Sequence, residues 1–208
     1  MINNLALSNE PFLEKWARFF RYKQSDQYLK PYLKNKGKVK LLDVGCGQDI
    51  LFLKYLQKTF PFLSKKINYY GLDPLVKNKK ILKQAKIINY KYENLKFKKP
   101  YFDIITMFAV LEHVDDPAQM IADMLVLLKK NGVLLLTTPS RLSKPVLEFL
   151  SFQLNLISPR EIAEHQNYFA KKSLLSLCDV SLKNGHGVKH SYFEFGLNNL
   201  LLIKKRSL

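Results

Sequence analysis

Cysteine is scarce in this chain, and its two cysteines, Cys46 and Cys178, are too few for a disulfide framework and lack metal-site spacing. No apolar run approaches the roughly 18 residues that a membrane-spanning helix needs. Residues 1–10 also lack the basic and apolar regions of a secretory signal. We therefore expect a cytoplasmic protein.

Acidic residues are few as well, since 17 Asp and Glu stand against 34 Lys and Arg, giving a net charge of +17. Such a charge attracts nucleic acid, an anionic membrane surface or an acidic substrate. The basic residues are almost all Lys, however, and they are spread along the chain beside many Asn and Ile. A genome rich in A and T would produce the same composition, so both interpretations remain open.

Apolar residues, in contrast, are plentiful. They occupy 47% of the 208 positions, which is enough for a globular core. Helical spacing of apolar residues predicts two helices before residue 36, at 11–22 and 24–33. Short apolar runs then predict strands at 39–44, 67–73, 86–90, 101–108 and 133–138. Between them lie predicted helices at 50–59, 76–84 and 117–130, the last with Asp116 as cap and Pro117 in its first turn.

Five strands separated by helices indicate βαβ units and therefore a parallel sheet in an α/β fold. After residue 140 the sequence predicts an apolar segment, a helix at 172–178 and a β-hairpin near 185–204. No linker or repeat interrupts the sequence, so we expect one domain, 1–208. It would comprise N-terminal helices (1–36), a core (38–139) and a C-terminal part (140–208).

A glycine pair follows the first predicted strand, in the sequence Asp43-Val-Gly45-Cys46-Gly47. Glycines here allow positive φ and let a ligand approach the backbone at the start of the next helix. A dinucleotide site would carry a third glycine at position 50, which is Ile. The second predicted strand ends in Asp73-Pro74, where a carboxylate can accept hydrogen bonds from a ribose diol or simply form a turn.

Two stretches carry a resemblance to a known family. Asp43-x-Gly45-x-Gly47 resembles the first motif of class I S-adenosylmethionine-dependent methyltransferases, although Asp49 stands where that motif usually has another glycine. Residues 102–117, with Phe-Asp at the start and Leu-Glu-His-Val-Asp-Asp-Pro at the end, resemble the signature of the ubiquinone, sugar and lipid methyltransferases. The resemblance covers about half the chain and implies a Rossmann-like sheet of seven mostly parallel strands, helices on both faces and an antiparallel last strand.

The resemblance also implies roles for individual residues. It places S-adenosylmethionine, and its product S-adenosylhomocysteine, on a set of candidate residues: Asp43, Gly45, Cys46, Gly47, Asp73, Pro74, Glu93, Asn94, Met107 and Phe108. His113 and His165 are candidate bases for a small-molecule acceptor, since imidazole exchanges protons near neutral pH. Either histidine can instead order the start of a helix.

A metal site is not expected, because Ala109 stands where some quinone methyltransferases have an additional metal-binding acid. The segment 140–170 replaces a short connection and is expected to lie over the acceptor, with Phe149, Phe152 and Tyr168 as pocket walls. It can equally pack on the sheet edge. Two other functions remain open: an RNA methyltransferase, favoured by the charge, and an inactive cofactor-binding partner subunit.

Overall fold

The computed structural model describes residues 11–74, 76, 85–88, 100–153, 167–179 and 185–206. Seven strands form one sheet in the order β3-β2-β1-β4-β5-β7-β6. Their bounds are β1 (Val39–Val44), β2 (Ile67–Leu72), β3 (Ala85–Ile88), β4 (Phe102–Phe108), β5 (Leu128–Pro139), β6 (Gly187–Phe193) and β7 (Asn198–Lys204). The first five strands pair in parallel, whereas β7 runs antiparallel to both of its neighbours. The predicted fold class is thus confirmed.

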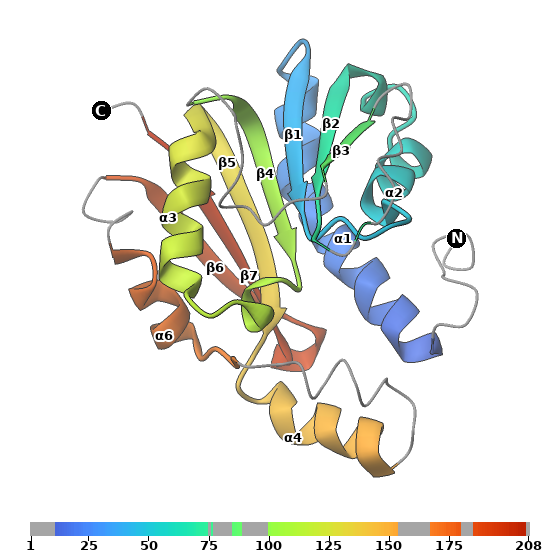
Figure 1. Cartoon of the computed structure of the whole chain (residues 1–208), viewed down its shortest axis with the longest axis vertical. Coiled ribbons are helices and arrows are strands. Elements are labelled where there is room, and N and C mark those ends of the chain that lie inside the picture. Colours follow the sequence, from blue (N-terminus) through green and yellow to red (C-terminus); the bar gives the residue numbers. More distant parts are fainter. Residues whose placement is uncertain are drawn as a thin grey trace.

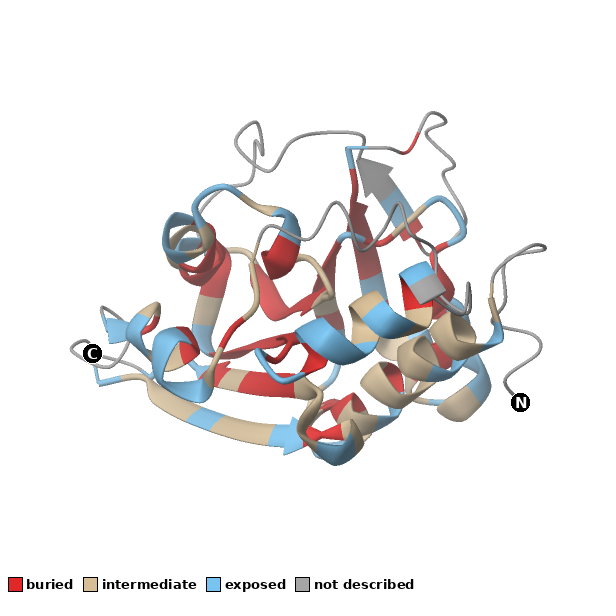
Figure 2. Ribbon diagram, turned by 90° about the horizontal axis from the view of Figure 1, so that it is seen from below, coloured by how far each residue is buried: buried red, intermediate tan, exposed pale blue. Residues whose placement is uncertain are grey.

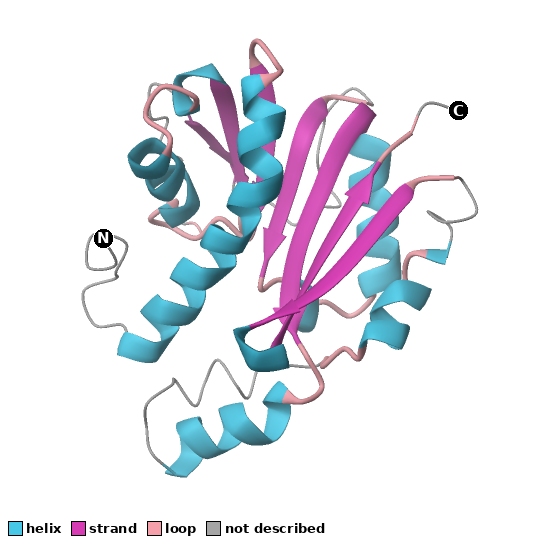
Figure 3. Ribbon diagram, turned by 180° about the vertical axis from the view of Figure 1, so that it is seen from behind, coloured by secondary structure: helices cyan, strands magenta, loops and turns pink. Residues whose placement is uncertain are grey.

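Helices cover both faces of this sheet (Figure 1). The described helices are α1 (Phe12–Lys34), α2 (Leu51–Thr59), α3 (Pro117–Leu127), α4 (Ser143–Glu148), α6 (Lys171–Ser176), the π-helical turn η5 (Phe149–Gln153) and the short 3₁₀ turns η2 (Ser64–Lys66), η4 (Leu111–His113) and η6 (Glu194–Gly196). In Figure 3, α1 and α2 lie on the near side of the strands and α3 and α6 on the far side. This arrangement buries both faces of the parallel strands.

Two hydrophobic cores follow from the alternation of side chains along each strand. On β1, Leu41 packs with α1 and α2, while its neighbour Leu42 packs with α3 on the opposite face. The central strands are buried almost throughout, and the helices expose their outer surfaces (Figure 2). β1 and β4 therefore lie in the buried centre of the sheet and hold the residues at their carboxyl ends in place.

The structure corrects two predicted boundaries. One continuous helix, α1, replaces the two helices expected before residue 36, because Leu29 and Leu33 continue its buried face and Pro31 is accommodated in the last turns. The helix α3 ends at Leu127 instead of residue 130. Leu128 is already extended, with φ of −81° and ψ of 132°, and pairs with Phe102 in the sheet.

Other details agree with the sequence. The carboxylate of Asp116 accepts a hydrogen bond of 2.9 Å from the backbone of Gln119, which confirms it as the cap of α3. Most of the helix predicted at 76–84 lies outside the described residues. Among the described residues, no helix combines the length and apolar character that crossing a bilayer would require.

Candidate active site

The glycine loop and the tip of the second strand meet at the carboxyl edge of the sheet. The backbone N–H of Gly45 donates to the carbonyl of Leu72 over 2.7 Å. Two residues later, the N–H of Gly47 donates to Oδ2 of Asp73 over 2.9 Å. Residues 26 positions apart in the sequence are thereby joined into one continuous surface. Pro74 follows Asp73 and is exposed.

Both glycines adopt backbone conformations that favour glycine, with φ of 73° at Gly45 and 65° at Gly47. A Cβ on Gly45 would lie 2.4 Å from Cγ2 of Val110, so the loop packs tightly against the segment after β4. A Cβ on Gly47 would meet nothing within 4 Å. The backbone at Gly47 therefore borders open space, which leaves room for a ligand to approach.

The departure at Asp49 is accommodated without a third glycine. Asp49 lies exposed in the loop, 3.9 Å from the ammonium of Lys54. The left-handed conformation falls instead on Ile50, whose φ is 44° and which directly precedes α2. Cys46 is buried, with its Sγ 2.7 Å from the position that a Cβ on Gly71 would occupy. Burial also raises the pKa of the Cys46 thiol, so it stays protonated.

Asp43 lies beneath the loop, 3% exposed, and bridges three strands. Its carboxyl group accepts hydrogen bonds from the hydroxyls of Tyr69 on β2 and Thr106 on β4, the latter over 2.7 Å. Burial raises the pKa of Asp43 to about 7, while the two hydroxyl donors oppose that rise and the charge of Asp73 adds to it. The structure thus shows a structural role for Asp43, and its contact with a cofactor stays a prediction.

This buried carboxyl group predicts a pH-dependent stability. Its pKa is about 7 in the folded chain, against an ordinary value of 3.8, so the folded state binds the proton more tightly. The contribution to the free energy of unfolding is complete below pH 3.8 and is lost as pH rises to about 7, by at most about 1.4 kcal/mol per pH unit.

This prediction is tested by urea unfolding of the wild type and of Asp43→Asn at several pH values. The values run from about 4 to about 8, roughly the range over which the Asp43 carboxyl group loses its proton. The stability of the wild type relative to the variant should decline across the window. The exposed Asp49→Asn variant provides the matched control and should show a constant difference. A constant difference for Asp43→Asn as well would contradict the prediction.

The carboxyl end of β4 faces the same edge of the sheet as the glycine loop. Met107 is completely buried against the α3 side. Phe108 packs on the opposite face, with its ring centroid 5.5 Å from Tyr22 of α1 and 4.8 Å from Phe52 of α2. Ala109 then turns the chain with a φ of 53°. The predicted cofactor contacts of Met107 and Phe108 remain predictions.

The turn η4 follows and carries the candidate base. Glu112 is 1% exposed, and its Oε2 accepts a hydrogen bond of 3.2 Å from Thr138 at the end of β5. Its Oε1 has no hydrogen-bond partner among the described residues, and burial raises the pKa of its carboxyl group. His113 directly follows and is exposed at the carboxyl edge. Glu112 therefore fixes the turn on which His113 is presented.

Two helical segments, α1 and α4, border this edge. The first half of α1 extends beyond the carboxyl ends of the strands, and α4 lies beyond the end of β5 (Figure 1). Leu142, Val146 and Phe149 follow β5 at the spacing of one helical face and are 68%, 37% and 55% exposed. The segment 140–153 thus lies on the side where the acceptor was predicted.

The structure brings together many of the predicted residues. Asp43, Gly45, Cys46, Gly47, Asp73 and the β4 exit share one edge, with His113 beside them. Glu93, Asn94 and His165 lie outside the described residues. The sequence did not identify Tyr69 and Thr106 as partners of Asp43, because their contact depends on the order of strands β2-β1-β4.

Comparisons with known proteins agree with this geometry. A family model described as a methyltransferase domain matches residues 14–180. The ubiquinone biosynthesis O-methyltransferase of Pelagibacter ubique is 31% identical over 185 residues, covering 85% of this chain and 70% of that protein. The corresponding enzyme of Haemophilus ducreyi is 29% identical, covering 77% of this chain and 73% of its own length.

Among solved structures, the plantazolicin methyltransferase BpumL in complex with a triazolic desmethylPZN analog and SAH has a TM-score of 0.68 at 18% identity. It matches 91% of this chain and 85% of its own chain, which supports the fold. From the family match and the relatives together, the chain belongs to the methyltransferase domain family and is an S-adenosylmethionine-dependent methyltransferase.

Proposed function

We propose that this enzyme methylates a hydroxyl oxygen on an aromatic small molecule that carries an apolar substituent. The observation that carries the proposal is the exposed apolar face of Leu142, Val146 and Phe149 beside the carboxyl edge. Water-exposed apolar side chains at helical spacing are costly unless something covers them. The relatives' names support oxygen as the acceptor atom, since both are O-methyltransferases of ubiquinone biosynthesis.

The described residues fit the cofactor. The open space at Gly47 leaves room for a ligand against the loop backbone, and Asp73 presents a carboxylate at the loop's margin. We assign the ribose hydroxyls to Asp73 and the approach of the cofactor to the Gly45–Gly47 backbone. Cys46 and Pro74 would border it, and Glu93 and Asn94 would lie towards the adenine. The bound cofactor supplies a methyl group already activated by its sulfonium.

The enzyme's own residues then have two tasks. The edge between η4 and α4 would position the acceptor hydroxyl and exclude water. His113 would accept the proton of that hydroxyl, while the bound cofactor would supply the methyl group and keep the electron pair of the bond that breaks. We keep His165 as a second candidate for this role. No metal is proposed to take part, because Ala109 provides no carboxylate at the β4 exit.

Methyl transfer to a catechol carrying an octyl chain, to unsubstituted catechol and to total RNA tests the proposal. The alkyl catechol should be the best substrate, by at least about tenfold in kcat/KM, since each buried methylene contributes about 0.8 kcal/mol. The variant Val146→Ser/Phe149→Ser should lose that preference and retain activity on catechol. Phe62→Ser, at an 81% exposed phenylalanine far from this edge, is the matched control.

Methylation of RNA without methylation of either catechol would replace the proposal by the RNA methyltransferase that the net charge of +17 favours. Cofactor binding without any transfer would favour the inactive partner subunit. We place the enzyme in the cytoplasm, which its two free, buried cysteines support. An anionic membrane that stores an apolar acceptor is a further candidate partner, given the same charge.

A further inference from the structure

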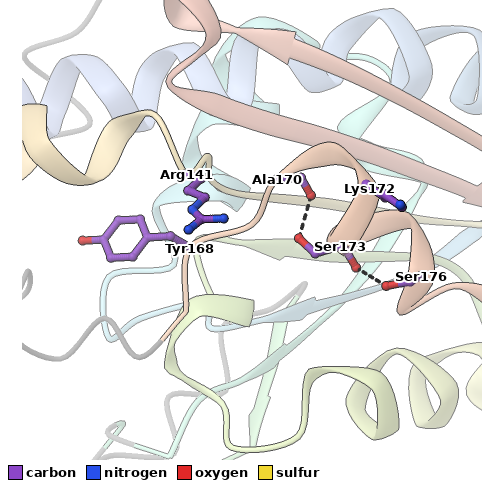
Figure 4. Close-up of a pocket in the computed structure, with 6 residues that line it drawn as sticks. All are labelled: Arg141, Tyr168, Ala170, Lys172, Ser173 and Ser176. Carbon is purple, nitrogen blue, oxygen red and sulfur yellow. Dashed lines mark hydrogen bonds between the residues drawn. The ribbon is translucent and has the colours of Figure 1, made fainter.

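A pocket of about 550 Å³ lies beside α6, on the acceptor side of the carboxyl edge. Its wall is formed by Arg141, Tyr168, Ala170, Lys172, Ser173 and Ser176. Figure 4 shows the guanidinium of Arg141 between the ring of Tyr168 and the first turn of α6. Arg141 comes two residues after the end of β5, so the pocket adjoins the strands that border the proposed methyl-transfer site.

The wall is held to those strands by backbone bonds. Phe169 donates to the carbonyl of Pro139 over 3.3 Å, and its own carbonyl accepts from the N–H of Arg141 over 3.2 Å. On the other side of Tyr168, the backbone N–H of Asn167 donates to the carbonyl of Glu112 over 3.2 Å. Residues 167–169, which carry one side of the pocket, are therefore fixed between the end of β5 and the turn η4 that carries His113.

The charges around the pocket are mainly positive. No ion pair joins Arg141 or Lys172 to a carboxylate in the part of the chain that the structure describes. A third cation, the ammonium of Lys144, lies 5.9 Å from the centroid of the Tyr168 ring. A planar guanidinium that faces a pocket, with no acid partner among the described residues, is well suited to a carboxylate or phosphate, which it binds through two parallel hydrogen bonds.

The neighbouring groups locate where an anion would sit. The hydroxyls of Ser173 and Ser176 donate to the carbonyls of Ala170 and Ser173, so their protons are already engaged. The pKa of Tyr168 is raised, first by burial and then by the negative charges of Glu148 and Glu112. An anion is consequently disfavoured at the Tyr168 hydroxyl and favoured on the α6 side of the Arg141 guanidinium (Figure 4).

We propose that this pocket binds a carboxylate substituent of the methyl acceptor, with Arg141 as its ligand. The inference rests on the proposed function for the identity of the acceptor. The inference adds a specificity determinant to the proposed function. The acceptor is amphipathic, with an apolar part against Val146 and Phe149 and an anionic group at Arg141.

Binding to the full chain saturated with S-adenosylhomocysteine tests the pocket. The probes are 3,4-dihydroxybenzoate and its neutral counterpart 4-methylcatechol, measured by calorimetry. In the wild type the acid should bind more tightly. Arg141→Gln should weaken binding of the acid by about 10-fold or more, as expected for a charged hydrogen bond, and leave 4-methylcatechol within about twofold. Arg206→Gln removes the same charge beyond β7, at the opposite end of the sheet, and should affect neither probe.

The outcomes separate the two proposals. Equal affinity of the wild type for both probes, or equal losses in Arg141→Gln and Arg206→Gln, would overturn the pocket. If the acid binds selectively through Arg141 but neither catechol is methylated, the pocket stands and the aromatic acceptor is wrong. Competition by inorganic phosphate as strong as that by dihydroxybenzoate would show a general anion site and overturn the assignment to the acceptor.

Discussion

Replacing His113 by glutamine should lower kcat by roughly 100-fold or more, the usual contribution of a general base, while the affinity for S-adenosylhomocysteine stays unchanged. His113 is exposed at the carboxyl edge, where the β4 exit, the glycine loop and the 140–153 segment converge. Glutamine preserves polarity and approximate size but cannot accept the acceptor's proton.

A purely structural role for His113 makes a different prediction. If the histidine only orders the start of α3, the variant would unfold at a lower temperature, and its kcat measured where it is still folded would stay close to that of the wild type. His186→Gln is the matched control, because His186 precedes β6 near Lys205, at the other end of the sheet. An unchanged kcat in His113→Gln would transfer the role of the base to His165 or remove the need for one.

The second large effect is expected at Asp73. Alanine at this position should weaken binding of S-adenosylhomocysteine by about 1–3 kcal/mol, roughly 5- to 150-fold, because both ribose hydroxyls lose their acceptor. The N–H of Gly47 loses its 2.9 Å partner at the same time. Calorimetry at constant pH measures the effect directly.

Asp49→Ala is the control for Asp73→Ala. It makes the same substitution in the same loop region, at an exposed carboxylate that pairs only loosely with Lys54. It should leave the affinity within about twofold, as for most exposed ion pairs. Equal affinities of the wild type, Asp73→Ala and Asp49→Ala for S-adenosylhomocysteine would show that Asp73 does not bind the cofactor.

Local sequence signals predicted much of this fold because each strand carries its own apolar run. β1 and β4 lie within a residue or two of their predicted bounds, and Asp116 and Pro117 mark the start of α3 correctly. Boundaries that depend on tertiary contacts were less predictable. α1 continues past residue 23 because Leu29 and Leu33 find a core to pack against, which local spacing does not reveal.

The same distinction applies to the site. The glycine loop and Asp73 are recognisable from residue type and spacing alone. The three-strand contact of Asp43 depends on sheet register, with Asp43 opposite both Gly71 and Thr106. The burial of Glu112 beneath His113 depends on Thr138, 26 residues away. The cationic pocket joins two segments through Phe169, a contact between residues that lie far apart in the sequence.

The position of β7 has a consequence for synthesis of the chain on the ribosome. β7 inserts between β5 and β6, although it is made after both of them. Until residues 198–204 have been translated, β5 has a free edge, and its apolar residues lack the strand that pairs with them. Nascent chains that stall before residue 198 therefore expose an unpaired, apolar strand edge on β5. Chaperones recognise such edges, and aggregation can start from them.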